Sequence, residues 1–319
     1  MSRLVVAVVD GGYDSYDIER RILAPFDVEV VLRDCNRDAA MVAQAVRDAD
    51  AVLVRESPVT AAAIAGMARC KAIVRYGIGV DNIDQSAARE RRIYVANVPD
   101  YGAEEVSDQA IALLLTVVRR VAARDRAVRG GAWNVSRAEK MYRVAGRTLG
   151  LVGYGRIARA FERKMRGMGV ARVLVNDPRV PEAPGVEPVD LATLCRDADY
   201  ISIHAPLTPQ TVHLIGREQF ASMKPTTIVV NTARGPLIEE AALVEALREG
   251  RIFGAGIDVY EREPPRKDHP LFALDNVVLS DHNGWYSEES VAELQTKAAQ
   301  EVARVFRGEP PKHWLNRWA

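Results

Sequence analysis

The stretch Gly150-Leu-Val-Gly153-Tyr-Gly155-Arg-Ile-Ala158 decides the fold of this chain. It follows an apolar, β-branched run and opens a helical pattern. Gly153 permits a tight turn, Gly155 lets the backbone approach a pyrophosphate, and the small Ala158 allows close packing of helix on strand. The start of the helix would offer N–H groups and the positive end of its dipole to the phosphates. Glycine turns also join strands to helices without any ligand, so the motif needs support.

An acidic residue supplies that support. The next apolar run, Val173 to Asn176, ends in Asp177, at about the 20-residue spacing of the dinucleotide fingerprint. A carboxylate there can accept hydrogen bonds from ribose hydroxyls and would repel a 2′-phosphate. The other interpretation is an ordinary turn, which Asp177-Pro178 would suit. Asp177 therefore favours NAD as the cofactor. Arg179 lies close enough to weaken this preference, so NADP stays as the less favoured alternative.

Short β-branched runs alternate with helical patterns from end to end, which is typical of parallel sheets covered by helices on both faces. The number of these runs exceeds the number of strands in one ordinary sheet, so the sequence predicts an α/β protein with two doubly wound domains. The runs are Leu4–Val9, Val28–Leu32, Ala51–Val54, Ala72–Val74, Tyr94–Val95, Thr148–Val152, Val173–Val175, Tyr200–Ile203, Ile228–Val230, Ala255–Asp258 and Val277–Leu279.

The domain boundary is expected at Pro99, where a chain breaker precedes a helix signal with Asp100 as its N-cap. The following helix has one apolar face, suited to buried packing or to a subunit interface. This face comprises Val106, Ala110, Leu113, Leu114, Val117 and Val121. A second amphipathic helix is expected from Ser287 to about Arg307 and could cross back to the first domain. We therefore predict a discontinuous substrate-binding domain (1–99 plus 287–319) and a nucleotide-binding domain (100–286).

The composition limits the possible partners. Lys plus Arg and Asp plus Glu both number 43, so no strongly basic field is available for nucleic acid or an anionic membrane. No apolar run is long enough to span a bilayer, and Met1–Asp10 resembles a first strand and not a signal peptide. The cysteines are too few and scattered for a disulfide framework or a metal site (Cys35, Cys70 and Cys195). We expect a reduced, soluble, cytoplasmic enzyme without a metal.

Three ionisable residues follow predicted strands near the end of the second sheet. Arg234 lies in Asn231-Thr-Ala-Arg-Gly235, Glu263 follows Gly256 to Tyr260, and His282 follows Val277–Leu279. Carboxyl ends of parallel strands meet at one edge, so the three could converge. A cation, a carboxylate and a histidine are what hydride transfer to a 2-keto acid requires. Each residue taken singly is better explained as a surface arginine, a solvated glutamate or a capping histidine.

Together these segments resemble the D-isomer-specific 2-hydroxyacid dehydrogenases over essentially the whole chain. The matching stretches are Gly77-Ile-Gly79-Val-Asp-Asn-Ile-Asp84, Gly150–Ala158, His204-Ala-Pro-Leu-Thr208, Asn231–Gly235, Gly256-Ile-Asp258, Glu263-Pro264 and His282. The run His282-Asn-Gly-Trp285-Tyr-Ser-Glu288 looks most like the C-terminal-binding-protein branch. The resemblance implies a Rossmann NAD-binding domain, a flavodoxin-like substrate domain and a homodimer formed through the 100–140 segment.

The resemblance also implies residue roles. Arg234 would grip the substrate carboxylate and carbonyl, His282 would exchange the proton, and Glu263 would be its partner. Related formate dehydrogenases carry glutamine where Glu263 stands, so the Glu–His pair favours alcohol–carbonyl chemistry. The expected cofactor contacts are Gly153, Gly155, Arg156, Ile157, Asp177, His204, Ala205, Pro206, Thr211, Thr232, Ala233 and Asp258. The expected substrate contacts are the Ile78 and Gly79 N–H groups, Arg75, Tyr76, Arg55 and Trp285, with Arg55 either facing a substrate tail or solvated.

The segment around His282 departs from the family pattern. Asp281 stands where the family usually has proline, and it could favour the charged form of His282 or point to solvent. Asn283 and Gly284 replace small apolar residues. We expect a small 2-hydroxy or 2-keto acid as substrate, such as hydroxypyruvate, glyoxylate, 3-phosphoglycerate or a sugar-derived acid. The competing hypothesis is an NAD(H)-sensing binding protein of the corepressor type with little catalysis.

Overall fold

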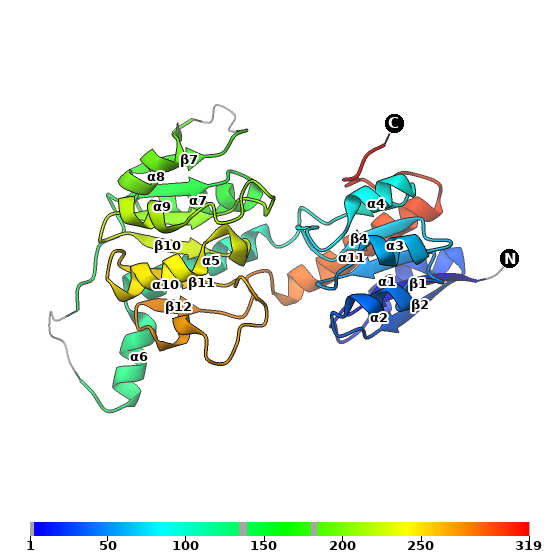
Figure 1. Ribbon diagram of the computed structural model, residues 1–319, viewed down its shortest axis with the longest axis horizontal. Coiled ribbons are helices and arrows are strands. Elements are labelled where there is room, and N and C mark those ends of the chain that lie inside the picture. The colour runs from blue at the N-terminus through cyan, green and yellow to red at the C-terminus, as the bar shows by residue number, and fades with distance from the viewer. Residues whose placement is uncertain (1–2, 134–138, 180–183, 319) are drawn as a thin grey trace. The chain divides into compact units, whose positions relative to one another are not determined.

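The computed structural model describes residues 3–133, 139–179 and 184–318. The chain divides into two compact units, one formed by Met1–Tyr101 with Ser287–Ala319 and the other by Gly102–Tyr286. Each unit contains one parallel sheet with helices on both faces (Figure 1). This architecture confirms the predicted fold class, and the division of the chain falls close to Pro99.

The second unit contains a seven-stranded parallel sheet in the order β12-β11-β10-β9-β6-β7-β8. The strands are β6 (Thr148–Val152), β7 (Arg172–Asn176), β8 (Glu187–Pro188), β9 (Tyr200–Ile203), β10 (Ile228–Asn231), β11 (Gly254–Ile257) and β12 (Val277–Leu279). The chain order reverses between β6 and β9, which is the topological switch point of a Rossmann sheet. The sequence did not predict β8, because this strand has only two residues and both are exposed.

Helices cover both faces of this sheet. On one face, α5 (Ala103–Val118) and α7 (Arg156–Gly167) bury their apolar sides against the strands. On the other face lie α8 (Leu191–Asp197), α9 (Arg217–Ser222) and α10 (Glu240–Arg248). Glycines in β11 allow α5 to approach closely: a Cβ at Gly256 would lie 2.7 Å from the Leu113 Cβ. This close packing fixes α5 against the strands that end at the candidate site.

The start and end of α5 differ from the prediction. Its N-cap is Gly102, in the left-handed region, and the helix ends at Val118. The Asp100 carboxylate instead lies 2.9 Å from the Lys297 Nζ, so Asp100 is not the N-cap. Val121 begins a separate helix, α6 (Val121–Arg129), and is 54% exposed, so it does not belong to the buried face.

The first unit contains a five-stranded parallel sheet in the order β2-β1-β3-β4-β5, which is flavodoxin-like. The strands are β1 (Leu4–Val9), β2 (Val28–Arg33), β3 (Ala51–Val54), β4 (Ala72–Arg75) and β5 (Tyr94–Ala96). Helices α2 (Ala39–Ala45), α3 (Ala61–Gly66) and α4 (Gln85–Glu90) pack around one apolar cluster. Helix α1 (Asp17–Leu23) packs against α11 (Glu288–Phe306), which also contacts β4. The C-terminal helix therefore belongs to the first unit, whereas its amphipathic pattern predicted the helix and left this return to the first domain open.

Within the described ranges, no helix combines the length and apolar character needed to cross a membrane. The same residues hold no group of three or more His, Cys, Asp or Glu side chains arranged for a metal ion. Cys35, Cys70 and Cys195 are all buried free thiols.

Candidate active site

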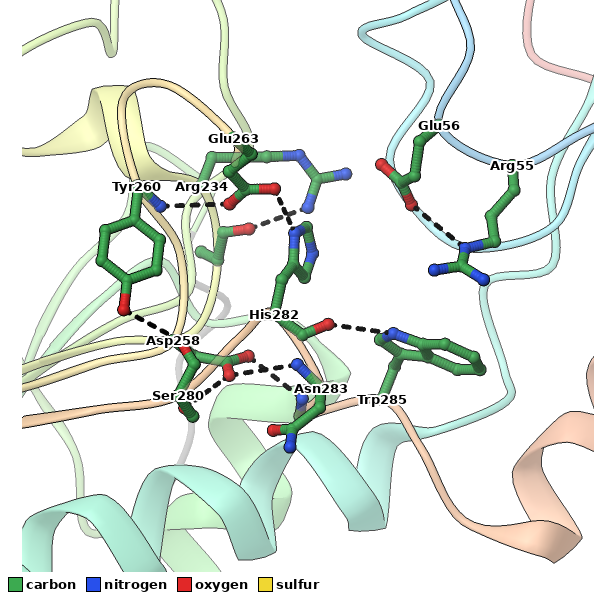
Figure 2. A network of polar contacts seen from close by, with 12 residues as sticks. Arg55, Glu56, Arg234, Asp258, Tyr260, Glu263, Ser280, His282, Asn283 and Trp285 are labelled. Carbon is green, nitrogen blue, oxygen red and sulfur yellow. Dashed lines mark hydrogen bonds and ion pairs between the residues drawn. The ribbon is translucent and has the colours of Figure 1, made fainter. Parts of the chain in front are cut away.

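The C-terminal ends of three adjacent strands define the candidate site. Arg234 follows β10, Glu263 lies in the loop after β11, and His282 follows β12. Because β10, β11 and β12 are neighbours in a parallel sheet, these segments leave the sheet at the same edge. Figure 2 shows the three side chains in one network of polar contacts.

A short contact joins the histidine to the glutamate. The His282 Nδ1 lies 2.6 Å from the Glu263 Oε2, and the Glu263 Oε1 accepts a hydrogen bond from the Tyr260 N–H at 3.0 Å (Figure 2). Both side chains are about one quarter exposed, at 25% and 26%. The backbone therefore fixes the carboxylate, the carboxylate fixes the imidazole, and Nε2 is the ring nitrogen left for an external group.

The loop that carries Arg234 is fixed by Asn231 at the end of β10. The Asn231 side chain donates to the Arg234 carbonyl oxygen at 2.8 Å and accepts from the Ala233 N–H at 3.0 Å. The guanidinium itself donates to the Ala233 carbonyl oxygen at 2.8 Å through Nη1. The loop and its guanidinium are therefore held by contacts within the same segment.

Asp258 fixes the loop that carries His282. It is 1% exposed, and its carboxylate accepts from the Ser280 hydroxyl at 2.6 Å and from the Asn283 and Gly284 N–H groups at 3.2 and 3.1 Å. These bonds hold the loop around His282. Asp281 is exposed, which favours the solvent-facing interpretation of this carboxylate.

The glycine turn has the geometry for a dinucleotide. Gly153 has φ +86°, and a Cβ there would lie 2.7 Å from the Ala205 backbone nitrogen, so only glycine fits. A Cβ at Gly155 would meet nothing within 4 Å, and helix α7 begins directly after it with no side-chain cap. Arg156 and Ile157 form its first turn. Open space before the uncapped start of a helix is what a pyrophosphate requires.

Other expected cofactor residues lie on the same edge of the sheet. The Asp177 carboxylate accepts from the Tyr154 N–H at 2.8 Å, which ties the end of β7 to the glycine turn. The Thr232 hydroxyl oxygen is buried and has no hydrogen-bond partner among the described residues. The Thr211 hydroxyl donates to the Pro206 carbonyl oxygen at 2.7 Å and so closes the loop after β9. The residues present thus fit a dinucleotide cofactor.

His204 follows β9 as a half-buried histidine. Its Nε2 lies 2.9 Å from the Ser202 hydroxyl, and its ring packs against Phe161. Burial lowers the pKa of His204 to about 3, because the charged imidazolium loses its hydration there. His204 is therefore neutral at physiological pH.

Within the first unit, the loop after β4 exposes two backbone donors. The N–H groups of Ile78 and Gly79 donate to no acceptor within the described residues. The Asn97 side chain and the Val98 N–H hold the neighbouring Ile78 and Gly77 carbonyls, at 2.6 and 2.9 Å. This arrangement suits a bound anion such as a carboxylate.

Arg75 and Tyr76 both bond to interior partners of the first unit. The Arg75 guanidinium donates to the Glu56 carboxylate at 2.8 Å and to the Tyr76 carbonyl oxygen at 2.6 Å, and the residue is only 6% exposed. The Tyr76 ring is 1% exposed, and its hydroxyl donates to the buried Glu19 at 2.7 Å. Both side chains therefore help to fix the loop that follows β4.

Arg55 and Trp285 remain more accessible. The Arg55 side chain is 27% exposed, and its Nε lies 3.9 Å from Glu56 (Figure 2). The Trp285 indole N–H donates to the His282 carbonyl oxygen at 3.0 Å. Trp285 therefore packs beside the histidine loop of its own unit.

Sequence reasoning missed several residues that shape the site. Gln109, Tyr260 and Ser280 all bond to the loops that carry Glu263 and His282. Tyr260 and Ser280 stand next to quoted motifs and could have been suspected. Gln109 lies on a helix far away in the sequence, and no pattern marks it.

The fold and the site together define a nicotinamide-dinucleotide-type α/β protein with an Arg, Glu and His set at the strand ends. The model of the D-isomer-specific 2-hydroxyacid dehydrogenase NAD-binding domain matches residues 111–284. The chain is 42% identical to the D-3-phosphoglycerate dehydrogenase of Methanocaldococcus jannaschii over 85% of its own length, and spans about half, 52%, of that relative. It is 39% identical to the glyoxylate reductase of Korarchaeum cryptofilum, covering 91% of this chain and 90% of the relative.

Among solved structures, a protein from Thermus thermophilus superimposes with a TM-score of 0.89 at 33% identity, over 98% of this chain and 100% of that one. The protein belongs to the D-isomer-specific 2-hydroxyacid dehydrogenase family. The predicted family is confirmed, whereas these relatives do not confirm the C-terminal-binding-protein branch.

Proposed function

We propose that the protein reduces a small 2-keto acid to the D-2-hydroxy acid, and catalyses the reverse reaction, with Arg234, Glu263 and His282 as its catalytic residues. NAD(H), when bound, supplies or accepts the hydride. The observation that carries the proposal is the 2.6 Å contact between His282 and Glu263 at the strand ends of a Rossmann sheet. The competing NAD(H)-sensing hypothesis explains the fold but gives no reason for this pair.

The site chemistry follows from the side chains. Arg234 would bind the carboxylate of the acid and polarise its carbonyl oxygen as negative charge develops there. The protonated His282 would give the Nε2 proton to that oxygen, and in the reverse direction Nε2 would remove the hydroxyl proton. Glu263 stabilises the imidazolium and holds the ring with Nε2 outward.

The first unit is proposed to supply the remaining substrate contacts. The unengaged N–H groups of Ile78 and Gly79 support a carboxylate-binding role. Arg55 is the candidate for contact with the tail of the acid, and Trp285 for contact with its side chain. Asp177 and the uncapped start of α7 support NAD as the cofactor.

The decisive experiment measures NADH oxidation with glyoxylate, hydroxypyruvate, its 3-phospho derivative and longer 2-keto acids. His282→Ala should lower turnover by about 10²–10⁴-fold and leave NADH binding intact. His213→Ala is the matched control, since His213 is 48% exposed and pairs with Glu261 on the surface. Tight NADH binding without turnover of any acid would instead support the sensing hypothesis.

The assembly and location of the protein are also proposals. We infer a cytoplasmic homodimer that binds a small acid and neither nucleic acid nor membrane. Exposed apolar side chains in and after α6, Val128 at 53% and Trp133 at 82%, support an interface in the 100–140 segment. Residues 134–138 of that segment lie outside the described residues. Analytical ultracentrifugation of the full chain and of Trp133→Glu tests the dimer, which the variant should weaken.

A further inference from the structure

The backbone of His282 adopts a conformation that residues with side chains avoid. Its φ is +59°, in the left-handed region. Such a conformation persists only where the surrounding structure determines it, and it is common where function demands a particular side-chain direction. The contacts on either side of His282 therefore decide where its imidazole points.

Asp258 accepts the hydrogen bonds that lie nearest to His282 in the loop. The His282 N–H donates to the Asp258 carbonyl oxygen at 2.8 Å, and the Asp258 carboxylate accepts from Ser280, Asn283 and Gly284. Residues before and after the histidine are thus tied to one buried carboxylate (Figure 2).

Gln109, on helix α5, donates further hydrogen bonds to this loop. Its Nε2 donates to the Ser280 Oγ at 3.0 Å and to the Asn283 Oδ1 at 3.2 Å, so both N–H bonds of one amide are used. A Cβ at Gly284 would lie 3.2 Å from the Gln109 Cγ, which shows that the loop also packs on this side chain. Gln109 on helix α5 therefore bonds to one residue before His282 and to one residue after it.

We propose that Gln109 is a positioning residue for His282. It takes no part in proton transfer; it holds Ser280 so that the hydroxyl points to Asp258, and it holds Asn283 so that the loop keeps its left-handed turn. The inference rests on the proposed function for its catalytic consequence, but the contacts themselves are independent of any substrate.

The test compares Gln109→Met, which keeps the length of the side chain and removes its donors, with Gln219→Met. Gln219 accepts a hydrogen bond from the Gly216 N–H at the start of α9 and is the matched control in the same unit. In Gln109→Met, amide hydrogen exchange in residues 279–286 should become at least about fivefold faster, since two hydrogen bonds are lost, with β9 and β10 unchanged. In Gln219→Met, exchange in 279–286 should remain unchanged.

Activity provides the second readout. With the keto acid that gives turnover, Gln109→Met should lower kcat about tenfold, leave the KM for NADH unchanged and raise the isotope effect from 4-deuterated NADH. In a Ser280→Ala background the same change should lower kcat by less than tenfold, because the bond to Ser280 is already lost and only the bond to Asn283 remains to be removed.

Each outcome decides the proposal. Unchanged exchange in 279–286 would overturn it, as would faster exchange with unchanged kcat, since the loop would then not need this support for catalysis. If the wild-type protein reduces no keto acid, the proposed function fails, while hydrogen exchange still shows whether Gln109 holds the loop.

Discussion

Replacing Glu263 by glutamine is the most direct test of the proposed proton-transfer pair. In the wild-type protein, the Glu263 Oε2 bonds to the His282 Nδ1 and the Oε1 accepts a hydrogen bond from the Tyr260 N–H. Glutamine has nearly the same shape but only one acceptor oxygen. Whichever way the amide turns, one of the two donors faces an NH₂ group, so Glu263→Gln removes both the charge and part of the orientation.

The expected loss can be estimated from the contact. Hydrogen bonds to charged groups contribute about 1.5–3 kcal/mol. Both side chains are about one quarter exposed, so solvent screening places the value near the lower end, about 1.5–2 kcal/mol. Since about 1.4 kcal/mol corresponds to a tenfold change in rate, kcat/KM should fall about 10–30-fold. The loss should appear in kcat, because the imidazole must be protonated and aimed at the carbonyl oxygen when its proton is transferred.

The assay is steady-state NADH oxidation, with NADH affinity measured separately by fluorescence. Glu261→Gln is the matched control: it breaks a second Glu–His contact, at 3.0 Å, between side chains that are 48% and 35% exposed. The control should stay within about twofold of the wild type, as exposed pairs contribute little. A Glu263→Gln enzyme with wild-type kcat/KM would refute the reasoning, because the short contact would then not support catalysis.

Two further predictions concern stability. Burial holds the folded-state pKa of His204 at about 3, against about 6.5 when unfolded, so the stability from its neutral form is complete above pH 6.5 and declines as the pH falls toward 3. Between pH 6.5 and pH 5 the free energy of unfolding should fall by at most about 2 kcal/mol through His204. Urea unfolding of His204→Gln at the two pH values should not show this part of the decrease. Gly77→Ala would place its Cβ 1.2 Å from the Arg75 Nη1, at φ +144°. The substitution should lower the free energy of unfolding by more than about 2 kcal/mol and raise the KM for the keto acid. Wild-type values of both quantities would contradict the role of Arg75 in fixing the loop after β4.

The sequence was sufficient for the fold because each level of pattern agreed. Apolar runs, glycine turns and helix signals alternated without conflict, and the strand-end rule placed Arg234, Glu263 and His282 on one edge of one sheet. The errors came from local choices. Asp100 has the chemistry of an N-cap, but Gly102 starts the helix and Lys297 pairs with Asp100. That pairing joins residues far apart in the chain, so no local pattern could show it.

Residues around the first-unit loop were harder to predict for another reason. Arg75 and Tyr76 adjoin the glycine-rich segment and are among the expected substrate contacts, but the sequence could not predict where their side chains point. The direction of a side chain at a strand end depends on the tertiary partner that accepts it, here Glu56 and Glu19. Gln109 is the opposite case, since a half-buried glutamine on a helix resembles an ordinary surface residue until the loop that it contacts is known.

The strand-end acids show why a functional motif and a structural support are easily confused. Asp177 and Asp258 each follow a strand of the second unit, where ligands of parallel sheets gather, and each uses its carboxylate to hold backbone N–H groups of a neighbouring loop. A parallel sheet ends in unpaired backbone donors that must be satisfied, and an aspartate at the strand end can satisfy them with one short side chain. The loop that it fixes then carries the reactive group. Selection for a precise loop and selection for a ligand contact therefore favour the same residue at the same place, and only the direction of the carboxylate tells them apart.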